Sequence, residues 1–305
     1  MQIPQVIVIT GPTATGKTAL GASLAREIGG EVVSADSMQV YEYMDIGTAK
    51  PTPEETLGVP HHMIGIVSPR EDYSVARYIS DAARCIESIE SRGKIPIIVG
   101  GTGLYIDSLL SGRDFSPKDS GSLRSELEAE YDKIGGEAML RKLNVFDPDS
   151  AAKLYANDKK RITRAFEVYI ASGKTIAQHD IETKSLPPRY DAKKYALTFQ
   201  DRSRLYARID SRVDAMLSAG LEREARLLLD MGIPPDSTAM QAIGYKEMAD
   251  VILGKTGITA AADIIKQRSR NYAKRQLTWL RRDETIQWIT WDKSPDLELG
   301  LSLIV

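Results

Sequence analysis

Residues 11–18 read GPTATGKT, which fits the spacing G-x-x-x-x-G-K-[ST] of a phosphate-binding loop. The flanking segments agree with this, because Val6–Thr10 is a short apolar run typical of a buried strand, and Thr18–Ile28 has a helical pattern that two glycines end. Backbone N–H groups of such a loop curl around an anion, and the helix N-terminus adds partial positive charge. The motif therefore predicts a diphosphate or triphosphate site, without identifying ATP. Its residues are Gly11, Pro12, Thr13, Ala14, Thr15, Gly16, Lys17 and Thr18.

Strand-like and helix-like segments alternate along most of the chain. The apolar runs typical of buried strands are Val6–Thr10, Glu31–Ser34, Ile95–Val99, Tyr195–Phe199 and Ile286–Trp291. Helical patterns fall at residues 18–28, 73–92, 203–231 and 259–282. This alternation predicts an α/β fold, with a P-loop parallel sheet flanked by helices.

The stretch from about residue 115 to 188 is different, because its apolar positions have helical spacing only, in residues 123–134, 137–143 and 151–170. We therefore expect an all-helical insertion domain. The expected organisation is a first part of the core at residues 1–114, the insertion at 115–188, and a completion of the core at 189–305 with a basic C-terminal helix.

Composition limits the classes of protein that the chain can belong to. The 40 basic and 42 acidic side chains leave a net charge of −2, so nucleic-acid binding needs a local basic patch. One cysteine, Cys85, and three histidines exclude a disulfide framework and a multi-cysteine zinc site. No apolar run approaches the ~18 residues of a membrane helix, and the N-terminus does not resemble a signal peptide. We expect a cytoplasmic protein with no membrane contact.

Polar residues follow two of the buried strands. Asp36 comes just after Glu31–Ser34, and Thr102 follows Ile95–Val99, whereas neither strand ends directly in the acidic magnesium ligand of P-loop NTPases. Ligands of open α/β sheets bind beyond the carboxyl ends of the strands, so both residues should lie near the phosphate loop. Asp36 is a candidate general base, or else a helix N-cap or an outer ligand of Mg²⁺. The glycines of Gly100–Gly103 form either a second close approach to ligand or a tight turn.

Basic residues gather in two segments. Residues 266–282 contain seven basic side chains and no acid, with Tyr272 and Trp279 between them. Residues 153–164 contain five basic side chains against Asp158 alone. Basic faces with aromatic residues suit an RNA backbone with stacked bases, and they are also typical of solvated helix faces.

The chain resembles the tRNA dimethylallyltransferases, also called tRNA isopentenyltransferases. The resemblance rests on blocks in the same order along nearly the whole chain: GPTATGKT (11–18), SADSMQVY (34–41), IGTAKP (46–51), HHMI (61–64), VGGTGLY (99–105), NDKKRITRAFEVY (157–169), RIDSRVDAML (208–217), MQAIGYKE (240–247) and YAKRQLTWLR (272–281). It implies a P-loop core with a helical insertion that grips a tRNA anticodon stem-loop. The implied reaction moves a dimethylallyl group from dimethylallyl diphosphate to N6 of the adenosine 3′-adjacent to the anticodon, with Mg²⁺ as cofactor. The single cysteine and the end at Val305 indicate the bacterial type, without the zinc-finger extension of some eukaryotic members.

The resemblance also implies roles for individual residues. Asp36 takes the proton of the N6 amine, a poor nucleophile that a base helps. Thr13, Lys17 and Arg212 act on the diphosphate leaving group, and Thr18 ligates Mg²⁺. A single tRNA bound by a monomer is the simplest assembly. The implied tRNA contacts are Asp36, Ser37, Met38, Gln39, Thr102, Arg124, Lys160, Arg161, Ile162, Thr163, Arg164, Gln241, Gly244, Lys246, Lys274, Arg275, Gln276, Trp279 and Arg281.

Two departures and three rival functions stay open at this point. Lys160 stands where the family has a glutamine, and Leu280 stands where an aromatic residue is expected. A prenyltransferase acting on AMP, ADP or ATP would not need the basic helices. A nucleotide kinase or ATPase would need an acidic magnesium ligand at a strand end. A non-catalytic RNA-binding protein would need neither the phosphate loop nor Asp36.

Overall fold

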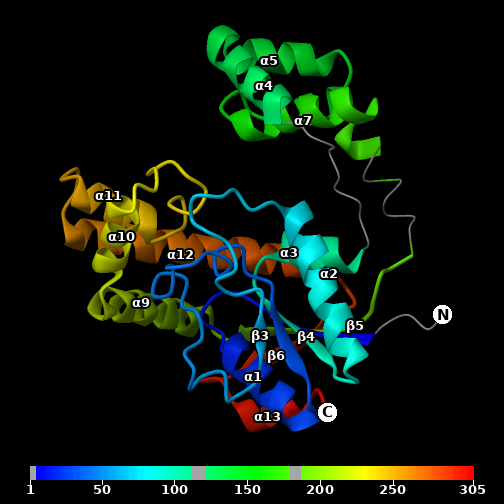
Figure 1. The fold of residues 1–305 in the computed structure, drawn as a ribbon, viewed down its shortest axis with the longest axis vertical. Coiled ribbons are helices and arrows are strands. Elements are labelled where there is room, and N and C mark those ends of the chain that lie inside the picture. Colours follow the sequence, from blue (N-terminus) through cyan, green and yellow to red (C-terminus); the bar gives the residue numbers. More distant parts are fainter. Residues whose placement is uncertain (1–4, 112–120, 179–180, 182–186) are drawn as a thin grey trace. The chain divides into compact units, whose positions relative to one another are not determined.

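The computed structural model describes residues 5–111, 121–178, 181 and 187–305 (Figure 1). The chain divides into two compact units, one made of Met1–Leu110 with Arg189–Val305 and the other of Ser111–Pro188. The second unit covers the region in which we expect the insertion. The boundary that we expect between residues 114 and 115 lies outside the described residues.

The first unit is built on a six-stranded sheet with the strand order β3-β2-β4-β1-β5-β6. Every pairing between neighbouring strands is parallel, as the alternation in the sequence predicts. The strands are β1 (Gln5–Thr10), β2 (Glu31–Ser34), β3 (His61–His62), β4 (Pro96–Gly100), β5 (Asp191–Phe199) and β6 (Gln287–Trp291). β1 lies in the middle, between β4 and β5, so the loop that follows it opens at the centre of the sheet's carboxyl edge.

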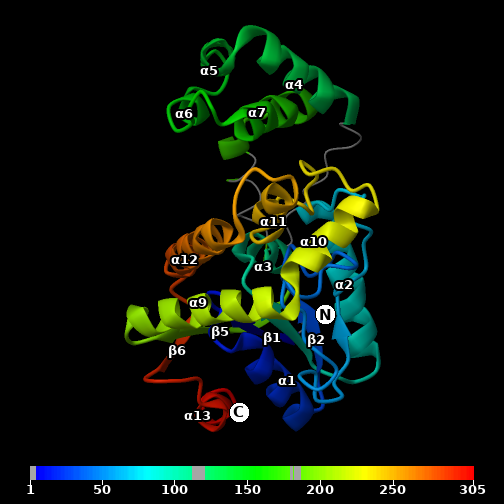
Figure 2. The ribbon, with the colours of Figure 1, turned by 90° about the vertical axis from the view of Figure 1, so that its left-hand side faces the viewer.

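Helices cover both faces of this sheet (Figures 1 and 2). α1 (Lys17–Ile28) packs against β1, β2 and β4, while α2 (Val75–Ser91) and α3 (Gly103–Leu110) pack against the opposite face, as right-handed crossovers require. The remaining helices are α9 (Arg202–Ala219), α10 (Leu221–Asp230), α11 (Tyr245–Ile252), α12 (Ile258–Leu280) and α13 (Leu297–Ser302). α9 packs along α12 and touches β5.

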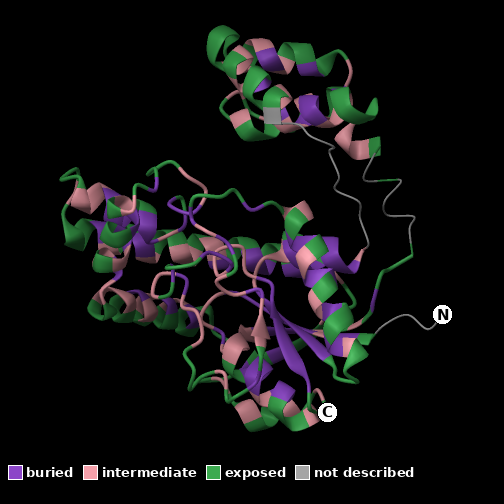
Figure 3. Cartoon of the chain, viewed as in Figure 1, coloured by how far each residue is buried: buried purple, intermediate pink, exposed green. Residues whose placement is uncertain are grey.

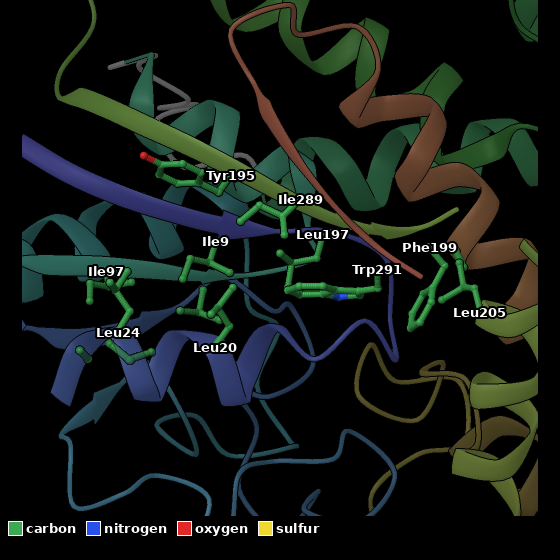
Figure 4. Packing of buried hydrophobic residues seen from close by; sticks show 14 of the residues in the cluster. Ile9, Leu20, Leu24, Ile97, Tyr195, Leu197, Phe199, Leu205, Ile289 and Trp291 are labelled. Atoms are coloured by element: carbon green, nitrogen blue, oxygen red, sulfur yellow. The ribbon is translucent and has the colours of Figure 1, made fainter. Parts of the chain in front are cut away.

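The main core lies between the sheet and α1. Leu20 and Leu24 of α1 point toward Ile9 and Ile97 of the sheet, and Trp291 of β6 fills the space beside them (Figure 4). β2 and β4 are buried along their whole length (Figure 3), which explains why β4 reads as a continuous apolar run instead of an alternating pattern.

The second unit is helical in all its described elements. α4 (Gly121–Ile134), α5 (Gly136–Asn144), α6 (Pro148–Ala151) and α7 (Lys159–Ser172) enclose a small core. That core contains Leu127, Met139, Leu143, Ile162, Ala165 and Phe166.

Several expected elements differ from the observed ones. The single helix expected over 203–231 is two helices, because Gly220 takes a left-handed backbone (φ 103°) between α9 and α10. The helix expected over 151–170 is interrupted, since α6 ends at Ala151 and α7 begins at Lys159. β5 begins at Asp191 rather than Tyr195. β3, α3, α11 and α13 are short, and their apolar patterns do not predict them.

Among the described residues, no helix combines the length and the apolar character that crossing a bilayer requires.

Candidate active site

The phosphate loop connects β1 to α1 at the carboxyl edge of the sheet. α1 begins at Lys17, and the Lys17 Nζ donates to the carbonyl of Pro12 at 2.7 Å. Burial, and to a smaller extent the positive charge of Arg212, lower the pKa of Lys17 to about 7 against the opposing effect of Asp36. Burial also lowers the pKa of Arg212. Two cations thus share a desolvated place that favours an anionic ligand.

Three side chains from the last third of the chain hold the loop in place. The Thr13 N–H donates to Gln276 Oε1 at 3.1 Å, and the Arg208 Nε donates to the carbonyl of Ala14 at 3.0 Å. The buried Trp291 donates its indole N–H to the carbonyl of Thr15 at 2.9 Å. Sequence reasoning missed Arg208 and Trp291 as loop contacts, since no local pattern connects them to a motif nearly two hundred residues or more away.

A cavity of about 320 Å³ lies next to the loop, within the first unit. It is bordered by the segments that follow β1, β2 and β4, by α9 and α12, and by the segment before α11. Of the residues that the sequence analysis singles out, it is lined by Thr13, Lys17, Thr18, Asp36, Ser37, Met38, Gln39, Arg212, Gln241, Arg275 and Gln276. One space therefore joins the phosphate loop to the predicted base and to α12.

Asp36 lies just beyond β2, as its position after the strand predicts. Its Oδ1 accepts the backbone N–H groups of Met38 at 2.9 Å and Gln39 at 3.4 Å, while Oδ2 has no hydrogen bond to the described residues. Thr102, which follows β4, accepts the N–H of Ser37 at 3.1 Å. One carboxylate oxygen thus fixes a turn, and the other is available to a ligand.

The glycines after β4 make room for α12. A Cβ on Gly101 would lie 2.3 Å from the Gln276 Nε2, and one on Gly103 would lie 2.5 Å from the Trp279 ring. Gln276 also donates to the carbonyl of Gly101 at 2.8 Å. Gln276 and Trp279 share one face of α12 with Tyr272. Burial and the negative charge of Asp36 raise the pKa of Tyr272 to about 12. The glycines after β4 therefore let α12 pack closely against this segment, which also borders the cavity.

Basic residues of α12 fall into two groups. Ion pairs join Lys266 to Asp214, Arg268 to Glu247 and Arg270 to Asp210, so the chain's own acids neutralise the first part of the cluster. In the part of the chain that the structure describes, no ion pair involves the second group, Lys274, Arg275, Arg281 and Arg282. The positive surface that we expected over 266–282 is therefore confined to the C-terminal part of the helix.

Several of the predicted contact residues in the first unit have internal partners, among them Gln39 and Gln241 and also Trp279, whose indole N–H donates to Asp107 Oδ2 at 2.7 Å. The Gln39 carboxamide accepts from the Ser34 hydroxyl and donates to the carbonyls of Thr48 and Ala49. Gln241 donates to the carbonyl of Pro235 and accepts from Lys246. Gly244, another predicted contact, is the N-cap of α11.

In the second unit, the predicted contacts separate by burial and pairing. Ile162 and Thr163 are fully buried, so their side chains do not reach the surface of this unit, and their contact with RNA stays a prediction. Arg124 and Arg164 pair with the buried Glu167 at 3.7 and 3.1 Å. Lys160 and Arg161, by contrast, make no ion pair with any described residue. The exposed basic positions of α7 are thus fewer than its sequence indicates.

Comparisons with known proteins agree over nearly the whole chain. The family described as "IPP transferase" matches residues 39–283, and the one described as "Isopentenyl transferase" matches residues 4–64. The chain is 49% identical to the tRNA dimethylallyltransferase of Carboxydothermus hydrogenoformans, over 93% of this chain and 91% of the relative. It is 45% identical to that of Acetivibrio thermocellus, over 94% and 92%.

Solved structures give the same picture. A full-length tRNA isopentenylpyrophosphate transferase from Bacillus halodurans matches 98% of this chain and 94% of its own, at 40% identity and a TM-score of 0.73. A eukaryotic dimethylallyltransferase studied acting on tRNA matches 97% of this chain and 75% of its own, at 31% identity and a TM-score of 0.80.

Proposed function

The chain belongs to the tRNA dimethylallyltransferase family, and from this membership we propose the reaction that its cavity carries out. It is a transferase that moves a dimethylallyl group from dimethylallyl diphosphate to N6 of the adenosine 3′-adjacent to the anticodon, releasing diphosphate. One observation carries the proposal: a single cavity joins the cations Lys17 and Arg212 to the carboxylate of Asp36. An anionic leaving group and a proton acceptor are what this reaction needs.

The donor half of the reaction takes place at the phosphate loop. The loop N–H groups, Thr13, Lys17 and Arg212 bind the diphosphate, and the two cations act more strongly as the C–O bond breaks, because negative charge grows on its oxygens. Their low local solvation strengthens this effect. They stabilise the transition state more than the bound donor, and so they raise turnover.

A magnesium ion fits this half of the site through Thr18. The Thr18 hydroxyl borders the cavity and makes no hydrogen bond to the described residues. No group of three His, Cys, Asp or Glu side chains in the described ranges could hold a metal by itself. Magnesium bound mainly through substrate phosphates and water needs few protein oxygens, so one hydroxyl suits it. When bound, Mg²⁺ neutralises charge on the diphosphate.

The acceptor half depends on Asp36. The N6 lone pair forms a bond to C1 of the dimethylallyl group as the C–O bond to diphosphate breaks, and the N6 proton passes to Asp36. Oδ2 accepts this proton, since Oδ1 already accepts two backbone N–H groups. A positioned base of this kind contributes about 10²–10⁴-fold.

The tRNA reaches the cavity along surfaces that keep unpaired positive charge. Lys274 and Arg275 of α12 and Arg281 just after it contact its phosphates, and so do Lys160 and Arg161 of the second unit. The adenine leaves its stack to enter the cavity, which costs a few kcal/mol that these contacts offset. A monomer that binds one tRNA is the simplest assembly for this reaction.

Label transfer from dimethylallyl diphosphate tests this function. Unmodified tRNA and AMP are offered in parallel with Mg²⁺, using the wild type, Lys17→Ala and Asp36→Asn. We expect transfer to tRNA alone, weaker donor binding in Lys17→Ala, and a turnover lowered by orders of magnitude with retained tRNA binding in Asp36→Asn. Transfer to AMP alone would overturn the partner, and normal turnover of Asp36→Asn would overturn the base.

A further inference from the structure

The segment that follows β2 forms one wall of the cavity and is held by a single carboxylate. Gly47, together with the next two residues, borders the cavity. Glu224 of α10 accepts the backbone N–H groups of Asp45 at 2.9 Å, Ile46 at 2.8 Å and Gly47 at 3.0 Å. The Tyr245 hydroxyl donates to the same carboxylate.

Four donors on one carboxylate make this contact a strong one. Hydrogen bonds to an ionised acceptor are about twice as strong as neutral ones. The N–H groups of Asp45 and Ile46 have no other hydrogen-bond partner among the described residues, and that of Gly47 also contacts the Tyr245 hydroxyl. The segment is also pressed against α11, because a Cβ on Gly47 would lie 2.4 Å from the Tyr245 ring. Glu224 therefore fixes the course of this wall.

The wall is connected in turn to Asp36. The Gln39 Nε2 donates to the carbonyl of Thr48 at 3.3 Å and to that of Ala49 at 3.1 Å. The backbone N–H of Gln39 donates to Asp36 Oδ1 at 3.4 Å. A continuous series of hydrogen bonds thus runs from Glu224 through the wall and Gln39 to Asp36.

We propose that Glu224 is a positioning residue for Asp36: it holds the wall against which Gln39 orients the carboxylate, and it does not touch either substrate. The inference rests on the proposed function, in which Asp36 takes the N6 proton. Removing the negative charge at residue 224 loosens the wall, so Asp36 Oδ2 spends less time within reach of the amine. A misplacement of about 1 Å in such a group costs on the order of 10²-fold in rate.

Single-turnover transfer to tRNA at saturating donor tests the proposal. Glu224→Gln keeps the shape of the side chain and removes its charge. Glu222→Gln is the matched control, because it removes the same charge two residues earlier, from a side chain that pairs with Arg226 on an exposed part of α10. We expect the rate constant of Glu224→Gln to fall 10- to 100-fold and that of Glu222→Gln to stay within twofold of wild type. A loss of folded protein would lower the amplitude instead of the rate constant.

Two further variants keep the test decisive. Tyr245→Phe removes one of the four donors and should slow transfer by a smaller factor, even where Glu224→Gln folds poorly. In the Asp36→Asn background, Glu224→Gln should slow transfer no further, because a residue that acts through Asp36 has nothing left to position.

The outcomes separate this inference from the function on which it rests. Equal rate constants for Glu224→Gln and Glu222→Gln would overturn the positioning role, as would a full additional loss in the Asp36→Asn background. If Asp36→Asn alone transferred at the wild-type rate, the assignment of the base would fail first.

Discussion

Replacing Gln276 with Met removes two hydrogen bonds of α12, one to the phosphate loop and one to the glycine segment after β4, at nearly constant side-chain length. The N–H of Thr13 loses its acceptor at 3.1 Å, and the carbonyl of Gly101 loses its donor at 2.8 Å. A buried backbone group left without a partner costs about 1–3 kcal/mol. Gln276 is 7% exposed, so water replaces neither bond well. The two losses together should lower the free energy of unfolding by about 2–6 kcal/mol.

Thermal denaturation and pyrophosphate titration measure the consequence. A loss of this size lowers the thermal midpoint by roughly 5–25 °C in a unit of this length. We also expect weaker pyrophosphate binding and an unchanged affinity for tRNA. Gln267→Met is the matched control, since Gln267 lies on the same helix with an exposed side chain. If Gln276→Met kept the midpoint of the control and lost affinity for tRNA, the carboxamide would be an RNA contact and the reasoning would be refuted.

Three other predictions concern charge and loop support. Lys17 has a pKa of about 7, and a bound anion favours its protonated form. Pyrophosphate binding at pH 8 should therefore take up a proton, and the affinity should fall as the pH rises. Calorimetry in two buffers measures the proton uptake, which Lys17→Met should abolish. Arg275→Ala should reduce by about 1 the slope of log affinity for tRNA against log salt concentration. Arg268→Ala should leave this slope unchanged and lower the thermal midpoint, because the Arg268 charge is paired with Glu247. Equal slopes for the two variants would contradict this prediction. Trp291→Phe removes the donor to Thr15 and should cost about 1–3 kcal/mol of stability, measured by thermal denaturation, without changing tRNA affinity.

Local patterns predict the parts of the fold that local physics decides. The run Val6–Thr10 and the glycines after it predict a buried strand and a phosphate loop, and β1 and α1 confirm both. Asp36 and Thr102 lie where the rule for carboxyl edges of strands predicts. The apolar periodicity does not predict the break at Gly220, because apolar residues at helical spacing continue from α9 into α10 on the other side of it.

Contacts between distant segments cannot be predicted in this way. Arg268 and Arg270 read as free charges within their own helix, yet their acidic partners belong to α11 and α9. Glu224 has no motif of its own, and its role depends on three backbone groups far away along the chain. Ile162 and Thr163 belong to a basic motif, but packing in their unit buries them. Pairing and burial are properties of the folded chain, so a single sequence gives only the residue types.

The chain leaves the sheet-containing unit after Leu110 and returns to it at Arg189, and a hydrogen bond connects these two residues. The N–H of Arg189 donates to the carbonyl of Leu110 at 2.8 Å, so the ends of the segment 111–188 lie side by side in that unit. A segment whose ends meet can be exchanged with little entropic cost to the remainder. Residues 111–188 are therefore a natural cassette: a relative's segment, or a short turn, could replace them at Leu110 and Arg189 while the phosphate loop and Asp36 keep their surroundings. Chimaeras built at this junction would separate the tRNA contacts made by residues 111–188 from those made by α12, so that each set could be engineered alone.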